Sequence, residues 1–88
     1  MSTQFKVFSA SWCMPCKAVK QKITTLPSET KELFVIFDEN SPELEKYVVK
    51  SFPTIIVEVN GQLVEVITGA STITNGAKFK DLLDRYNL

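Results

Sequence analysis

The stretch from Trp12 to Lys17, WCMPCK, holds both cysteines of the 88-residue chain, three positions apart. Its proline suits the first turn of a helix, where the missing N–H breaks no helical hydrogen bond. Apolar side chains then recur at helical spacing, which predicts a helix from Met14 or Pro15 to Leu26. Residues 4–9 (QFKVFS) are rich in Phe and Val and predict a strand just before it. The cysteines therefore stand at a strand-to-helix turn.

The rest of the chain also divides into short strands and helices. Residues 33–37 (LFVIF) show no polar alternation, which is typical of a central parallel strand covered on both faces. Asn60-Gly61 is a strong hairpin signal, because a type I′ turn needs positive φ at both positions. A polar loop is expected at 27–30, followed later by a short helix at 42–50. Ser41 should cap that helix, and its apolar side consists of Leu44, Tyr47 and Val48. Strands are expected at 55–59 and 62–68, then a break at Gly69 and a last helix that begins within 71–75.

Together these elements predict an α/β fold in the order β-α-β-α-β-β-α. The first two strands should be parallel and joined by a right-handed βαβ connection, and the last two should form an antiparallel hairpin. We therefore expect a four-stranded mixed sheet with three flanking helices, placed on both faces, in a single domain of residues 1–88.

The composition excludes several classes of function. Ten basic residues balance ten acidic ones, so we expect no general attraction to nucleic acid or to anionic lipid. The longest apolar run, residues 33–37, is too short to span a membrane, and the amino terminus does not read as a signal peptide. The chain has no histidine, which excludes a Cys–His or Ser–His hydrolase within it. Two cysteines in a small chain of this kind indicate redox or metal chemistry in the cytoplasm.

The two thiols have different predicted roles. Cys13 should sit at or just before the helix amino terminus, where free N–H groups and the helix dipole favour a thiolate. Cys16 lies one turn further in, on the apolar face, and should be more buried. We therefore expect Cys13 to attack a disulfide and Cys16 to resolve the mixed disulfide. Two other interpretations are a half-site for zinc, which would need ligands from a second chain, and a purely structural disulfide.

Several motifs resemble the thioredoxin family. The stretch at 12–17 is similar to the active-site sequence WCGPCK, with Met14 in place of glycine, and Phe52-Pro53-Thr54 resembles the cis-proline segment. Asn60-Gly61 resembles the family's hairpin turn, and Gly69 resembles the glycine after its last strand. The resemblance covers nearly the whole chain and implies a thioredoxin-like fold, although the strand and helix that precede the core in common thioredoxins are not present.

The resemblance also implies roles for individual residues. The peptide bond before Pro53 should be cis, and its segment should offer backbone groups to a bound substrate chain. Asp38 is either a hydrogen-bond acceptor for the indole of Trp12 or a solvated strand end, and Lys17 is expected to be a solvated helix residue with a small local field. The expected contact surface for substrates consists of Trp12, Met14, Pro15, Phe52, Pro53, Thr54 and Gly69.

Two departures from the family bear on mechanism. Thioredoxins usually carry a buried aspartate six residues before the first cysteine and a lysine that pairs with it; here these positions are Val7 and Phe34. Replacing both members of a buried charge pair together is physically coherent, because neither charge is left unpaired. Our hypothesis is that water or the Cys13 thiolate takes the proton of Cys16. A third departure is Gln21 in place of a helix-kinking proline, which predicts a straighter helix.

The leading interpretation is a monomeric thiol–disulfide oxidoreductase that reduces protein disulfides, with no cofactor or metal of its own. The family resemblance implies that a flavin- and NADPH-dependent thioredoxin reductase restores the dithiol. One alternative is a glutaredoxin-like protein recycled by glutathione, although Trp12 before the pair and a missing Gly-Gly-x-Asp pattern argue against it. Another is a binding module that has lost catalysis, although the presence of both cysteines argues against it.

Overall fold

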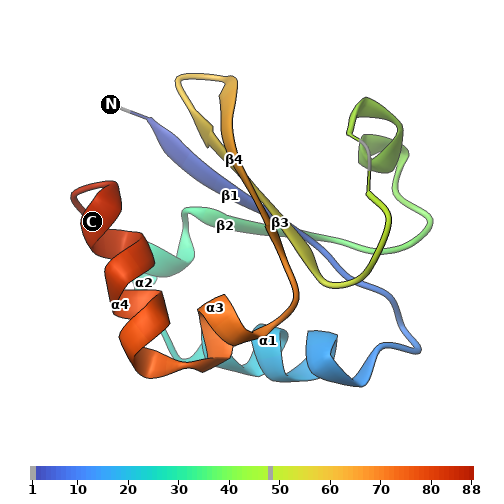
Figure 1. The fold of residues 1–88 in the computed structure, drawn as a ribbon, viewed down its shortest axis with the longest axis horizontal. Helices are drawn as coiled ribbons and strands as arrows, with labels where there is room; N and C mark the ends of the chain where they lie inside the picture. Colours follow the sequence, from blue (N-terminus) through green and yellow to red (C-terminus); the bar gives the residue numbers. More distant parts are fainter. Residues whose placement is uncertain (1, 48) are drawn as a thin grey trace.

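A computed structural model of the protein describes residues 2–47 and 49–88. Its elements lie close to the expected ones, with strand limits shifted by about one residue, as is usual for such assignments. In chain order they are β1 (Thr3–Phe8), α1 (Met14–Thr24), α2 (Ser28–Lys31), β2 (Phe34–Phe37), the 3₁₀ helix η1 (Pro42–Lys46), β3 (Thr54–Val59), β4 (Gln62–Thr68), α3 (Ser71–Thr74) and α4 (Gly76–Arg85) (Figure 1).

The strands form one mixed sheet of four in the order β2-β1-β3-β4, which confirms the predicted architecture. Strand β1 pairs parallel with β2 and antiparallel with β3, and β3 pairs antiparallel with β4. The β3–β4 turn has positive φ at Asn60 (54°) and Gly61 (82°), as the hairpin signal predicts. The sequence therefore specifies this turn locally.

The main hydrophobic core lies between one face of the sheet and the helices α1, α3 and α4 (Figure 1). On α1 the buried residues are Cys16, Val19 and Ile23, the spacing that the sequence predicts for its inner face. Strand β1 supplies Phe5 and Val7 to this core, both fully buried. Side chains alternate along a strand, so Lys6 and Phe8 point to the opposite face, which η1 covers in part.

The structure corrects the predicted end of the first helix and the loop after it. Helix α1 ends at Thr24, two residues before the expected Leu26, and 27–30 is not simply a loop because Ser28–Lys31 form α2. The hydroxyls of Thr24 and Thr25 donate to the carbonyls of Gln21 and Lys22, each at 2.7 Å. Such local bonds compete with the helical ladder and favour its end here.

The prediction that residues 33–37 form a central strand was wrong. Strand β2 is an edge strand, and Ile36 on it is exposed. Its apolar character on both faces has another cause: Phe34 stacks on Phe5 with 4.6 Å between ring centroids, and Phe37 stacks on Phe8 at 5.3 Å on the other face. Cross-strand aromatic pairs stabilise a sheet without a second neighbouring strand.

The two later helices also differ from expectation. The helix expected at 42–50 is the 3₁₀ helix Pro42–Lys46, and Val48 lies outside the described residues. Ser41 does cap it, because its Oγ accepts the N–H of Glu43 at 3.3 Å. Tyr47, the residue after it, has an extended backbone with φ of −132° and ψ of 154°. The final helix is split into α3 and α4 at Asn75, whose Oδ1 accepts the N–H of Lys78 at 3.1 Å.

Candidate active site

The two cysteines are joined in a disulfide at the amino terminus of α1, with their Cα atoms 5.3 Å apart. Cys13 is the N-cap residue of this helix, and its Sγ accepts the N–H of Cys16 at 3.3 Å. The first N–H groups of a helix have no partner within the helix, so a thiolate of Cys13 would find donors here. The predicted position of Cys13 is therefore confirmed.

Both cysteines are buried. Cys13 is 5% exposed and Cys16 is 1% exposed, so Cys13 is the more accessible of the two. The N–H of Cys13 donates to the carbonyl of Ala10 at 3.1 Å, which holds the turn that enters the helix. Ala10 and Phe52 pack against the two cysteines in a small cluster separate from the main core.

Large exposed apolar side chains flank the disulfide. Trp12 is 70% exposed and Met14 is 69% exposed, on either side of Cys13 in the sequence. The ring of Trp12 meets that of Phe52 edge to face, with 5.7 Å between centroids. Tertiary folding thus joins the two predicted contact segments into one surface, which we call the aromatic rim and define as Trp12, Met14 and Phe52. Pro15 and Lys17 are exposed beside it on α1.

The Phe52–Pro53 peptide bond is cis, as the family resemblance predicts. Pro53 is buried, and its carbonyl accepts the N–H of Gly69 at 2.9 Å, where Gly69 has φ of 85°. Thr54 is buried as well, and its hydroxyl donates to the carbonyl of Ser51 at 2.6 Å. Pro53 and Thr54 are therefore buried within the segment, and Phe52 is the side chain of this segment that packs against the two cysteines.

A model of the thioredoxin family matches residues 5–82 of the sequence. The chain belongs to the thioredoxin family. Thioredoxin of Staphylococcus aureus is 35% identical over 78 residues, which are 84% of this chain and 75% of that protein. Thioredoxin of Echinococcus granulosus is 34% identical over 67 residues, and there the match spans only 63% of the relative's length.

The fold agrees with solved thioredoxins. The structure of Fasciola hepatica thioredoxin superposes with a TM-score of 0.76 at 29% identity, covering 94% of this chain and 79% of that one. The structure of reduced Schistosoma mansoni thioredoxin superposes with a TM-score of 0.75 at 28% identity, covering 97% of this chain and 79% of that one. The comparisons therefore agree with the motif resemblance over nearly the whole of this chain.

One acidic residue near the site was missed in the sequence. The carboxylate of Glu39 accepts the N–H of Ser11 at 2.8 Å and its hydroxyl at 3.0 Å, so it holds the turn that carries Trp12. Hydrogen bonds from its own amide and from Ser11 lower the pKa of the Glu39 carboxyl below its usual value of 4.5. Asp38 instead accepts the N–H of Asn40 at 2.9 Å and caps its own turn. Both acids follow β2, and sequence alone did not show which one reaches the site.

The positions where the family usually has a buried charge pair are apolar in the structure too. Val7 is 0% exposed and Phe34 is 8% exposed, and both belong to the main core. Their neighbours there are apolar side chains from β3, α1 and α4. How Cys16 loses its proton stays a hypothesis. Within residues 2–47 and 49–88, no three side chains gather in a way that could hold a metal ion, and no helix is long and apolar enough to cross a bilayer.

Proposed function

We propose that this protein reduces disulfide bonds in other proteins through the Cys13–Cys16 pair. The observation that carries the proposal is the disulfide at the N-cap of α1 beside the aromatic rim, in a chain of the thioredoxin family. A helix amino terminus stabilises the thiolate that must attack, and an apolar rim gives contact surface to a substrate segment.

The reaction proceeds in two exchanges. In the dithiol form, the Cys13 thiolate attacks one sulfur of the substrate disulfide, and the other substrate sulfur leaves as a thiolate that takes up a proton. The Cys16 thiol then loses its proton and attacks the Cys13 sulfur, which releases the second substrate thiol. The substrate gains two electrons and two protons, and the protein ends with the Cys13–Cys16 disulfide.

Turnover requires a reductant that restores the dithiol. We propose a flavin- and NADPH-dependent thioredoxin reductase, acting on a monomer of this protein in the cytoplasm, where thiols are kept reduced. The protein itself would need no cofactor, because the two cysteines carry both electrons. Protein disulfides would be its substrates, docked on the aromatic rim and along the backbone of the Pro53 segment.

The proposal is tested with purified protein, thioredoxin reductase and NADPH on a model protein disulfide. We expect NADPH oxidation that depends on the substrate, and loss of turnover in Cys13→Ser and Cys16→Ser. Cys16→Ser should trap a mixed disulfide with the substrate, whereas Cys13→Ser should not. Reduction of glutathione mixed disulfides alone would indicate the glutaredoxin-like function, and failure of both assays would indicate a binding module.

A redox-buffer titration read through Trp12 gives a second test. This residue is the chain's one tryptophan and adjoins Cys13, so its fluorescence should follow the state of the pair. A reductase requires a midpoint close to that of cytosolic thiols, in the range of about −220 to −320 mV. A midpoint above about −150 mV would refute a reducing role and indicate disulfide formation instead.

A further inference from the structure

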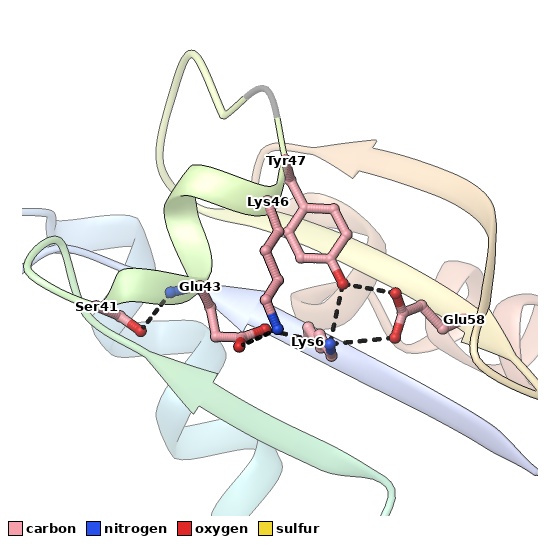
Figure 2. Close-up of polar contacts among 6 residues, drawn as sticks. All are labelled: Lys6, Ser41, Glu43, Lys46, Tyr47 and Glu58. Atoms are coloured by element: carbon pink, nitrogen blue, oxygen red, sulfur yellow. Dashed lines mark hydrogen bonds and ion pairs between the residues drawn. The ribbon is translucent and has the colours of Figure 1, made fainter.

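A cluster of charged and phenolic groups lies on the sheet face opposite α1 and α4. Figure 2 shows three side chains pointing toward one another: Lys6 of β1, Glu58 of β3, and Tyr47, which directly follows η1. Glu43 of η1 lies beside them. The Nζ of Lys6 lies 2.9 Å from the hydroxyl of Tyr47, 3.2 Å from Glu58 Oε1 and 3.3 Å from Glu43 Oε2. The Tyr47 hydroxyl donates to Glu58 Oε2 at 2.5 Å. We call Lys6, Tyr47, Glu43 and Glu58 the polar cluster.

The cluster is partly buried and its groups satisfy one another. The side chains of Lys6 and Glu58 are only 14% and 13% exposed. The bond to Tyr47 raises the pKa of the Lys6 ammonium above 10.5, and burial raises the pKa of the Tyr47 phenol above 10.0. Lysine therefore stays charged and tyrosine stays neutral at physiological pH, so neither is a nucleophile. The arrangement is suited to holding η1 against the sheet.

Helix η1, as far as the described residues show, adds little to the hydrophobic cores. None of its residues, Pro42–Lys46, is buried, so it contributes no fully covered apolar side chain to either core. The Tyr47 ring does lie beside Phe8, with 5.7 Å between centroids. Among residues 2–47 and 49–88, this segment contacts the sheet through the polar cluster and through the aromatic contact of Tyr47 with Phe8.

The aromatic rim includes a residue that follows this segment closely in the sequence. Phe52 follows Tyr47 by five positions and packs against both Trp12 and the cysteines. Its carboxyl side is fixed to the sheet by Thr54, whose hydroxyl donates to Ser51. On its amino side, Tyr47 contacts the sheet at Lys6, Phe8 and Glu58. Cys13 is also in contact with Phe52, but its place at the helix start is set by α1 and by the carbonyl of Ala10, neither of which involves η1.

We propose that Lys6, Tyr47 and Glu58 are positioning residues that set how tightly the protein binds its protein substrates. They act through Phe52: when η1 is released from the sheet, the rim loses its fixed shape, and docking weakens. The disulfide chemistry at Cys13 stays as it is. This inference rests on the proposed reductase function and extends it to residues on the far side of the sheet.

Tyr47→Phe is the test, and Tyr86→Phe is a matched control. Tyr86 donates to Glu65 at 2.6 Å, with Arg85 on the same carboxylate at 2.9 Å, so it forms a similar phenol–carboxylate–cation group. That group joins α4 to β4 and does not touch the segment before Phe52. For Tyr47→Phe we expect KM for a protein disulfide to rise about fivefold or more, the factor that one hydrogen bond represents. We expect kcat to stay within about twofold.

Three further readouts separate positioning from loss of stability. Tyr47→Phe should leave the redox midpoint of the Cys13–Cys16 pair unchanged, and it should reduce a small aromatic disulfide as fast as the wild type does. Tyr86→Phe should lose comparable stability in urea yet keep its KM. Glu58→Gln, which keeps the shape but weakens the bonds, should raise KM in the same direction and serves if Tyr47→Phe does not fold.

The outcomes distinguish this inference from the proposed function. An active wild type with equal KM in Tyr47→Phe and Glu58→Gln would overturn the positioning role alone. An equal rise of KM in Tyr47→Phe and Tyr86→Phe would overturn it too, because general loss of stability would then explain both. No turnover by the wild type would overturn the proposed function and this inference together.

Discussion

Replacing Val7 by aspartate should destabilise the folded protein, and the loss should grow as the pH rises. Val7 is fully buried, and the core around it consists of apolar side chains, among them Phe5, Val19 and Ile55. A carboxyl group placed there meets neither water nor a lysine, because the usual lysine position is Phe34. Burial disfavours its charged form and therefore raises its pKa in the folded state.

Two effects add up to the expected loss of folding stability in Val7→Asp. A buried neutral carboxyl without a hydrogen-bond partner costs about 1–3 kcal/mol at any pH. If its folded-state pKa rises from about 3.9 to 7 or above, linkage adds about 1.5 kcal/mol at pH 5 and about 4 kcal/mol at pH 7. The sign follows from the raised pKa: stability is retained below the unfolded value and lost as the pH rises above it. A domain of this size has about 4–13 kcal/mol in total, so the loss at pH 7 is a large share.

Urea unfolding of the oxidised protein, followed by circular dichroism from pH 4.5 to 7, measures this loss. Val7→Asn is the matched control, because it is similar in size and polarity but does not titrate, so its loss should be nearly constant across the range. Equal stability of Val7→Asp at pH 5 and pH 7, together with faster turnover, would refute the apolar interpretation of this site. It would also mean that Cys16 can use a carboxylate as its proton acceptor.

Three other predictions concern stability. The bond from Tyr47 lowers the pKa of Glu58, so this carboxylate stabilises the fold above about pH 4.5 and less as the pH falls below it; Tyr47→Phe should flatten that acid dependence in urea unfolding between pH 2.5 and 7. Burial raises the pKa of Tyr86 to about 12, so stability should fall as the pH rises from 10 to 12, and Tyr86→Phe should remove that fall; an unchanged alkaline profile would contradict it. Gly69→Ala should cost about 1–2 kcal/mol through its φ of 85°, without a clash, whereas Gly76→Ala, equally open but without positive φ, should be neutral or slightly stabilising by thermal unfolding.

The sequence alone predicted the parts of the fold that depend on nearby residues. The strand-to-helix turn, Cys13 at the start of α1, and the buried face of α1 follow from interactions between residues within about four positions of one another. The Asn60-Gly61 turn is similarly local, since it depends on which residues tolerate positive φ. These features form the chemical centre of the site, and local sequence is enough to predict them.

Tertiary structure decided the features that join distant residues. The apolar run at β2 is typical of a central strand, yet β2 lies at the sheet edge, because hydrophobicity does not reveal how many neighbours a strand has. The contact of Trp12 with Phe52, and the choice of Glu39 over Asp38 to hold the Ser11 turn, depend on the relative placement of segments far apart in sequence. The polar cluster around Lys6 likewise exists only once β1, η1 and β3 are assembled. Local propensity says which element forms, but only strand pairing and packing decide which side chains then meet.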